Sequence, residues 1–152
     1  MTTTGNEAAI ERNKETFRSI IEEGFNKGNY AALDPLFAAD YQEHQFGLKM
    51  TLEGFKGDIQ YLRTAFPDFH LTIDDMIAEN DMVWARMTAR GTNHGPFLGA
   101  PTGKPFSAAV MDVCRFKDGK LVEHWGVPDR FATIVQLGLL PQAAGSKWEQ
   151  TS

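Results

Sequence analysis

M-D-V-C-R-F-K-D-G-K-L-V-E-H-W-G-V-P-D-R-F-A-T-I-V-Q-L, residues 111–137, is the stretch of sequence that decides the fold. Asp118-Gly119 lies between two strand-like runs, and this pair favours a tight hairpin turn because both central residues need positive φ. Pro128 ends the pairing of the second strand, and Asp129 is a good helix N-cap. The stretch therefore predicts a hairpin followed by a short helix that ends at Gly138.

The second strand of this hairpin carries polar side chains on an otherwise apolar face. Since side chains alternate along a strand, one face is expected to hold Leu121, Glu123, Trp125 and Val127, continued by Asp129. A two-residue loop would pair Cys114 with Glu123, Asp112 with Trp125 and Val110 with Val127. Buried carboxylates must be paired, hydrated or protonated, so a face of this kind predicts a partly polar pocket.

Composition restricts the class of protein and partner. With 152 residues, 42% of them hydrophobic, the chain is expected to form one domain over residues 7–141, followed by a flexible tail over 142–152. A formal net charge of -5 without a basic run argues against nucleic acid or an anionic membrane as partner. A small hydrophobic molecule or another protein chain is expected instead. The single cysteine and the absence of a signal-peptide pattern favour a cytoplasmic location.

Hydrophobic periodicity gives the order of the elements. Helices are expected over about 7–26, in a short segment from Asn29 through Leu33, and from the N-cap Thr51 to Pro67. Strands are expected over 69–78, 82–92, 106–116 and 120–127. This order predicts an α+β fold in which a curved antiparallel sheet wraps around the N-terminal helices and forms a cone with an internal pocket.

The strand over 82–92 has two contrasting faces. Alternation assigns Val83, Ala85, Met87 and Ala89 to the face under the helices. The other face carries Trp84, Arg86 and Thr88, and we expect it to join subunits in a homodimer or a higher homo-oligomer.

Four segments carry the family resemblance: residues 68–92 (D-F-H-L-T-I-D-D-M-I-A-E-N-D-M-V-W-A-R-M-T-A-R-G-T), 97–104 (F-L-G-A-P-T-G-K), 116–129 (F-K-D-G-K-L-V-E-H-W-G-V-P-D) and 136–140 (Q-L-G-L-L). Together they resemble the SnoaL-like polyketide cyclases, also called ester cyclases. The resemblance covers about residues 10–141. It implies the cone-shaped α+β fold of ketosteroid isomerase and a cofactor-free intramolecular aldol ring closure.

The resemblance also implies roles for individual residues. The family's acid/base aspartate corresponds to Asp129, its pocket histidine to His44 in Y-Q-E-H, and its hairpin tryptophan to Trp125. Family members usually read R-G-T-H-x-G, whereas this chain reads R-G-T-N-H-G, which places Asn93 where a histidine is expected. By strand parity Asn93 should face the pocket, yet it cannot shuttle protons near neutral pH.

Each of these residues also has a structural alternative. Asp129 could simply cap the last helix, and His44 could be a hydrogen-bonded core histidine. Trp125 is more often core than catalytic, although its indole N–H, His44 or Asn93 could each donate to an oxyanion. The candidate site therefore comprises catalytic Asp129 and His44, with substrate contacts from Trp125, Asn93, Asp112, Phe97 and Tyr41.

The remaining predictions concern His70, His124, metal binding and alternative reactions. His70 and His124 alternate away from the predicted inward set, so both are interpreted as surface or interface residues. No histidine spacing matches a metal-ligand motif, and no metal site or cofactor is expected. The alternatives to aldol closure are epoxide or ester hydrolysis, dehydration, isomerisation, or non-catalytic binding of a small ligand.

Overall fold

The computed structural model describes residues 2–140 of the chain, with side chains from residue 4 onward. The predicted tail over 142–152 lies outside the described residues. The helices are α1 (Thr2–Ser19), the π-helix η1 (Ile20–Asn26), the 3₁₀-helix η2 (Tyr30–Leu36), α2 (Leu52–Ala65) and α3 (Arg130–Gln136). The strands are β1 (Phe37–Glu43), β2 (His70–Glu79), β3 (Met82–Thr92), β4 (Pro105–Lys117) and β5 (Lys120–Pro128). Within residues 2–140, no helix has the length and apolar character that crossing a membrane requires.

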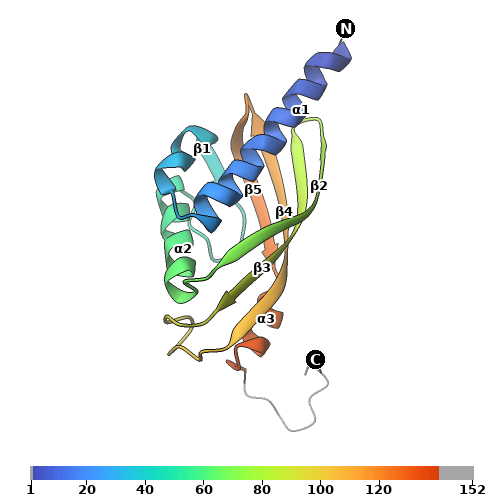
Figure 1. Cartoon of the computed structure of the whole chain (residues 1–152). Helices are drawn as coiled ribbons and strands as arrows, with labels where there is room; N and C mark the ends of the chain where they lie inside the picture. The colour runs from blue at the N-terminus through green and yellow to red at the C-terminus, as the bar shows by residue number, and fades with distance from the viewer. Residues whose placement is uncertain (1, 141–152) are drawn as a thin grey trace.

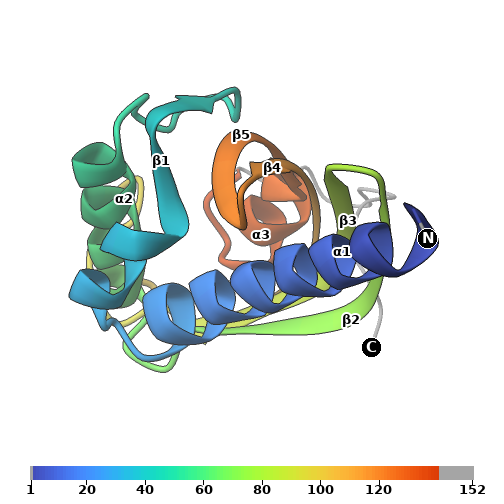
Figure 2. The same cartoon turned by 90° about the horizontal axis from the view of Figure 1, so that it is seen from above.

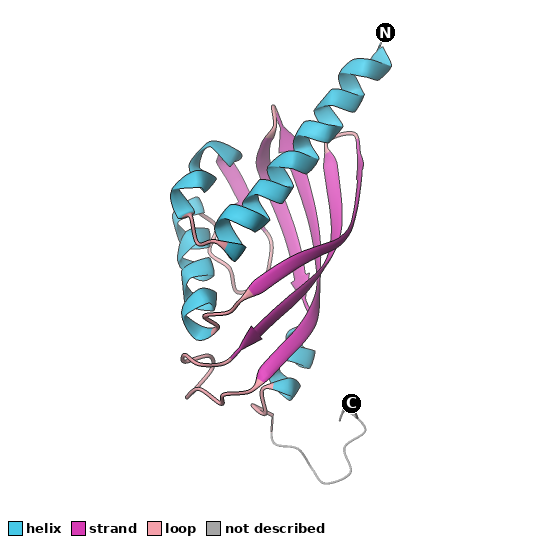
Figure 3. Cartoon of the chain, viewed as in Figure 1, coloured by secondary structure: helices cyan, strands magenta, loops and turns pink. Residues whose placement is uncertain are grey.

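A five-stranded sheet in the order β1-β5-β4-β3-β2 forms the body of the molecule. It curves strongly, and the helices gather beside its concave side (Figures 1 and 3). The predicted α+β cone is therefore confirmed. The sheet is mixed, however, because β1 pairs with β5 in parallel. No strand was predicted over residues 37–43, because their polar and aromatic composition gives a weak pattern of hydrophobic alternation.

Helix α1 crosses the sheet diagonally, and α2 stands at an angle to it, as the view from above shows (Figure 2). The hydroxyl of Thr16 in α1 donates to the carbonyl oxygen of Gly119 at 2.7 Å, which ties the helix to the β4–β5 turn. The predicted cap of α2 is confirmed, since the side chain of Thr51 accepts a hydrogen bond from the backbone N–H of Gly54.

Strand β3 has the two faces that alternation predicted. Val83, Ala85, Met87 and Ala89 are all buried in the core. On the opposite face the side chain of Trp84 is 54% exposed. The helices therefore cover only one side of this part of the sheet.

The turn between β4 and β5 confirms one prediction, and the pairing beyond it corrects another. Asp118 and Gly119 have φ values of 52° and 73°, as a primed two-residue turn requires. Past the turn, however, Phe116 pairs with Leu121 and Arg115 pairs with Glu123, which leaves Val122 without a partner. Val122 is thus a β-bulge in β5, and one extra residue exchanges the two faces of every residue that follows.

The expected pairs are therefore wrong. Cys114 pairs with His124, Asp112 with Gly126 and Val110 with Pro128. His124 is buried at 6% exposure instead of lying at the surface. Glu123 and Trp125 are only half-buried, and neither lines the internal cavity.

Candidate functional site

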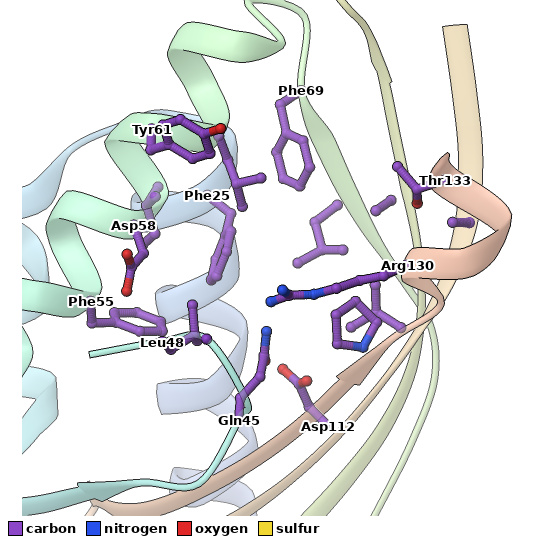
Figure 4. Close-up of a pocket in the computed structure, with 18 of the residues that line it drawn as sticks. Phe25, Gln45, Leu48, Phe55, Asp58, Tyr61, Phe69, Asp112, Arg130 and Thr133 are labelled. Carbon is purple, nitrogen blue, oxygen red and sulfur yellow. The ribbon is translucent and has the colours of Figure 1, made fainter. Parts of the chain in front are cut away.

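A cavity of about 260 Å³ lies between the helices and the concave face of the sheet. Figure 4 shows its side chains converging from α2, from the segment after β1, from β4 and from the start of α3. Most of the wall is apolar, as in most small-molecule sites. The polar residues that line it are Gln45, Asp58, Tyr61, Asp112, His124, Arg130 and Thr133.

A chain of buried polar side chains lies behind one wall of this cavity. The hydroxyl of Tyr41 donates to Glu43, whose carboxylate oxygens lie 2.8 and 2.9 Å from Nδ1 of His124. On the other side of the ring, Nε2 of His124 lies 3.3 Å from Oδ2 of Asp112. The imidazole is therefore held between two carboxylates, an arrangement that fixes its orientation.

These contacts determine the charge of His124. Burial alone would lower the pKa of its imidazole, but the negative charges of Asp112 and Glu43 and their hydrogen bonds outweigh burial and raise this pKa to about 10. Burial works to raise the pKa of Glu43, and the hydrogen bonds and positive charge of His124 overcome it, so this pKa is lowered. At neutral pH His124 is therefore an imidazolium paired with the carboxylate of Glu43.

Asp112 is the member of the chain that reaches the cavity. Its Oδ2 faces His124, whereas its Oδ1 is buried and has no hydrogen-bond partner among residues 2–140. An unpartnered buried carboxylate oxygen is costly, and it is uncommon in folded proteins. Asp112 is also one of the residues that line the cavity.

Gly126, the β5 partner of Asp112, packs without a side chain against this oxygen. A Cβ at position 126 would lie 2.0 Å from Oε1 of Gln45, 2.8 Å from Cε1 of His124 and 3.0 Å from Oδ1 of Asp112. Only glycine leaves room there for the Gln45 side chain. Figure 4 shows the Gln45 amide beside the Asp112 carboxylate.

Asp129, the predicted acid/base residue, does not line the cavity. Its side chain is exposed, and its Oδ1 accepts a hydrogen bond from the backbone N–H of Ala132 at 2.9 Å. This is the helix-capping geometry that the sequence left open as an alternative. Two neighbours of Asp129, Pro128 and Arg130, do line the cavity.

His44 and Trp125 also lie away from the cavity lining. Their rings stack at 4.9 Å with an interplanar angle of 9°. Nε2 of His44 lies 3.7 Å from Oε2 of Glu123, with the imidazole 39% exposed. His44 therefore packs on the face of β5 that carries Trp125, opposite the face that carries His124. The Val122 bulge places Trp125 on that outer face.

The remaining predicted residues divide between the cavity and the scaffold. Phe97 lines the cavity and packs against Phe66 at a centroid distance of 5.1 Å. Asn93 is fully buried and does not line it. Its amide donates to Gly95 O at 2.7 Å and accepts from Thr102 N at 2.9 Å, so it holds both ends of the 95–102 loop. Tyr41 is buried in the core, where its ring meets Phe37.

Sequence reasoning missed Glu43, His124, Gln45 and Arg130. One signal was available, because Tyr41 and Glu43 alternate in a segment that is a strand, and Gln45 continues the same parity. The position of His124 had no such signal, since no rule of composition places a bulge at Val122. Among residues 2–140, no cluster of three or more His, Cys, Asp or Glu side chains could hold a metal ion.

Comparison with known proteins gives a consistent result. The family model of the SnoaL-like polyketide cyclases matches residues 15–137. No curated protein matches the chain. Among solved structures, TsrD from Streptomyces laurentii is similar at 30% identity and a TM-score of 0.74, covering 88% of this chain and 97% of that one.

Two further structures are similar over most of their length. Wild-type IdmH from Streptomyces antibioticus, a proposed polyketide cyclase, has 33% identity and a TM-score of 0.75, with coverage of 83% of this chain and 98% of its own. A protein from Catenulispora acidiphila with a ketosteroid isomerase-like fold has 19% identity and a TM-score of 0.70, covering 84% of this chain and 94% of its own. That last likeness concerns the fold alone. With its family model spanning nearly the whole cone, the chain belongs to the SnoaL-like polyketide cyclase family.

Proposed function

We propose that this protein binds a small, largely apolar, carbonyl-bearing compound and catalyses proton transfers on it, as in an intramolecular aldol ring closure, with Asp112 as the acid/base group. The observation that carries this proposal is Oδ1 of Asp112, a buried carboxylate oxygen without a hydrogen-bond partner among the described residues, in the wall of an apolar cavity. A general base must lie within hydrogen-bond reach of the proton that it removes, and no other described group occupies this oxygen.

The reaction needs two proton transfers and one hydrogen-bond donor. Oδ1 of Asp112 takes a proton from the carbon next to the substrate carbonyl, and the Gln45 amide donates a hydrogen bond to the enolate oxygen that forms. The enolate carbon then attacks a second carbonyl carbon of the same molecule, and a carbon–carbon bond closes the ring. The new alkoxide takes the proton back from Asp112, which returns to its starting state.

The buried chain behind Asp112 has a positioning role in this proposal. The His124 imidazolium engages Oδ2, so Oδ1 keeps a fixed direction toward the cavity. Glu43 and Tyr41 in turn fix the ring of His124. A base held in this way is arranged before the substrate binds, which lowers the cost of reaching the transition state.

The family correspondence supports another assignment, with Asp129 as the acid/base group and His44 as a donor. An exposed capping carboxylate and a ring stacked on Trp125 are less suited to these roles. We therefore place Asp112 first. For the whole protein we propose a cytoplasmic enzyme that forms a homodimer or a higher homo-oligomer, on the sequence grounds given above.

Proton abstraction can be measured without the natural substrate. Hydrogen–deuterium exchange at the α-carbon of 2-tetralone, an apolar ketone, is followed in D₂O by NMR. Wild-type protein should accelerate exchange, and Asp112→Asn should lower the catalysed rate by about 10²- to 10⁴-fold, the range of general acid–base catalysis.

Asp129→Asn and His44→Ala are the matched variants in this assay. We expect both to retain most of the catalysed rate, with Asp129→Asn losing some thermal stability because the cap of α3 is weakened. If Asp129→Asn abolishes exchange in a folded protein while Asp112→Asn retains it, the family correspondence is right and our assignment is wrong.

A further inference from the structure

Arg130 is a cation in the wall of the apolar cavity. It begins α3, and Figure 4 shows its side chain extending across the cavity toward Gln45. Its Nη2 donates to the backbone carbonyl oxygen of Phe46 at 3.2 Å. No carboxylate within residues 2–140 forms an ion pair with it. A guanidinium has five N–H donors, and one carbonyl oxygen leaves most of them available.

The protein backbone makes room for this guanidinium. Gly47 has a φ of 87°, and a Cβ there would lie 3.2 Å from Nη1 of Arg130. A side chain at position 47 would therefore be strained and would crowd the cation. The hydrogen bond to Phe46 O therefore positions the Arg130 guanidinium at the cavity, and Gly47 leaves the space that it occupies.

Each of the two described acidic residues that line the same cavity has one carboxylate oxygen engaged by another group. Oδ2 of Asp58 accepts the backbone N–H of Lys49 at 3.1 Å. Oδ2 of Asp112 faces Nε2 of His124. Neither forms an ion pair with Arg130, so neither supplies the planar pair of oxygens that a guanidinium binds with two parallel hydrogen bonds.

We infer that Arg130 binds a carboxylate of the substrate, so the ligand of this cavity is an apolar compound with a carboxylate at the end that meets residues 45–47. This rests on the proposed function for the reacting carbonyl, and it adds the acidic group that selects the substrate. Asp112 then acts on one part of the ligand while Arg130 holds another, which limits how the molecule can turn in the cavity.

Direct binding of two nearly isosteric probes tests this inference. 2-Naphthoate carries a carboxylate, and 2-naphthamide has the same shape without the charge. Titration calorimetry should give a Kd for 2-naphthoate about tenfold below that for 2-naphthamide, as expected for one charge-assisted pair at a partly exposed site. Arg130→Gln should bring the two Kd values together.

Lys49→Gln is the matched control. It removes an exposed cation near residues 45–47, and Lys49 does not line the cavity. We expect the preference for 2-naphthoate to persist in this variant. The inference is overturned if 2-naphthoate does not bind the wild type, if 2-naphthamide binds equally well, or if the preference survives Arg130→Gln.

The same titrations separate this inference from the proposed function. Asp112→Asn should lose proton exchange on 2-tetralone and keep the preference for 2-naphthoate. If the preference depends on Arg130 but wild-type protein exchanges no proton, the carboxylate site stands and the proposed reaction fails. If exchange depends on Asp112 and 2-naphthoate is not preferred over 2-naphthamide, the proposed reaction stands and the carboxylate site fails.

Discussion

At the residue scale, the buried chain from Tyr41 to Asp112 is the feature with the largest chemical consequence. His124, Glu43 and Asp112 are removed from water together; His124 and Glu43 are compensated by their neighbours, whereas Asp112 is engaged through Oδ2 alone. Breaking such a group by removing one member leaves an uncompensated buried charge, which is far more costly than losing a surface pair.

The charge on His124 predicts how stability depends on pH. Its pKa is raised from 6.5 to about 10 in the folded protein, so its pairing contributes fully below pH 6.5 and is lost as the pH rises through 10. We therefore expect the melting temperature to fall between pH 7 and pH 10.

The variant His124→Asn isolates this dependence. It should melt at a lower temperature than wild type near pH 6 and show a flatter decline toward pH 10. The matched variant His44→Asn alters an imidazole that is 39% exposed and should keep the wild-type slope. A slope unchanged in His124→Asn would show that other groups control alkaline stability.

Gly126 supplies a second prediction at this scale. In Gly126→Ala the new methyl group would displace the flexible end of Gln45, which is the nearest atom at 2.0 Å, and crowd Asp112 Oδ1. Proton exchange on 2-tetralone should fall by about 10-fold or more while the fold persists, because a donor to the enolate is lost. Exchange at the wild-type rate would remove Gln45 from the mechanism.

At the element scale, the β4–β5 hairpin shows how far sequence reasoning reached. Asp118-Gly119, Pro128 and Asp129 each have a strong local conformational preference, and the turn, the strand end and the helix cap are where they were predicted. Val122 has no such preference. The bulge there is selected by packing across the whole sheet, so the faces of His124 and Trp125 could not be derived from alternation alone.

Strand β1 was not predicted, for a related reason. Its burial comes from contact with β5, a partner far along the chain, and Glu43 is tolerated in it because His124 is opposite. Neither fact is visible in residues 37–43 by themselves. The alternation of Tyr41, Glu43 and Gln45 could therefore be interpreted only once the pairing of β1 with β5 was known.

The 95–102 loop gives a prediction for Asn93. Asn93→Ala would leave Gly95 O without its buried partner and Thr102 N without its partly buried one, at about 1–3 kcal/mol for each unsatisfied group. In a domain of this size we expect the melting temperature to fall by about 5–15 °C. His94→Ala, an exposed neighbour, should change it little, and calorimetry compares the two.

At the scale of the whole molecule, the outer face of the sheet carries an unusual row of apolar side chains. Ile77, Trp84, Val113 and Trp125 pair in sequence across β2, β3, β4 and β5. Ile77 is 68% exposed, and Trp84 is 54% exposed. Contiguous exposed apolar patches mark contact surfaces on soluble proteins, which fits the predicted homo-oligomer.

Sedimentation velocity at micromolar concentration tests this prediction. Wild type should sediment as a dimer or larger, and Trp84→Glu should shift it toward monomer because a charge is forced into the contact. Phe46→Glu changes a side chain that is 91% exposed elsewhere, and it should leave the assembly intact. A wild-type monomer would contradict the expected assembly.

Val122, the unpaired residue in β5, can be related to variation in the length of this strand. Deleting Val122 would make β5 regular and would leave the pairs Arg115–Glu123 and Cys114–His124 in place, so His124 would still face the interior. A residue gained or lost here therefore changes the local bend of the hairpin and not the set of side chains that line the cavity.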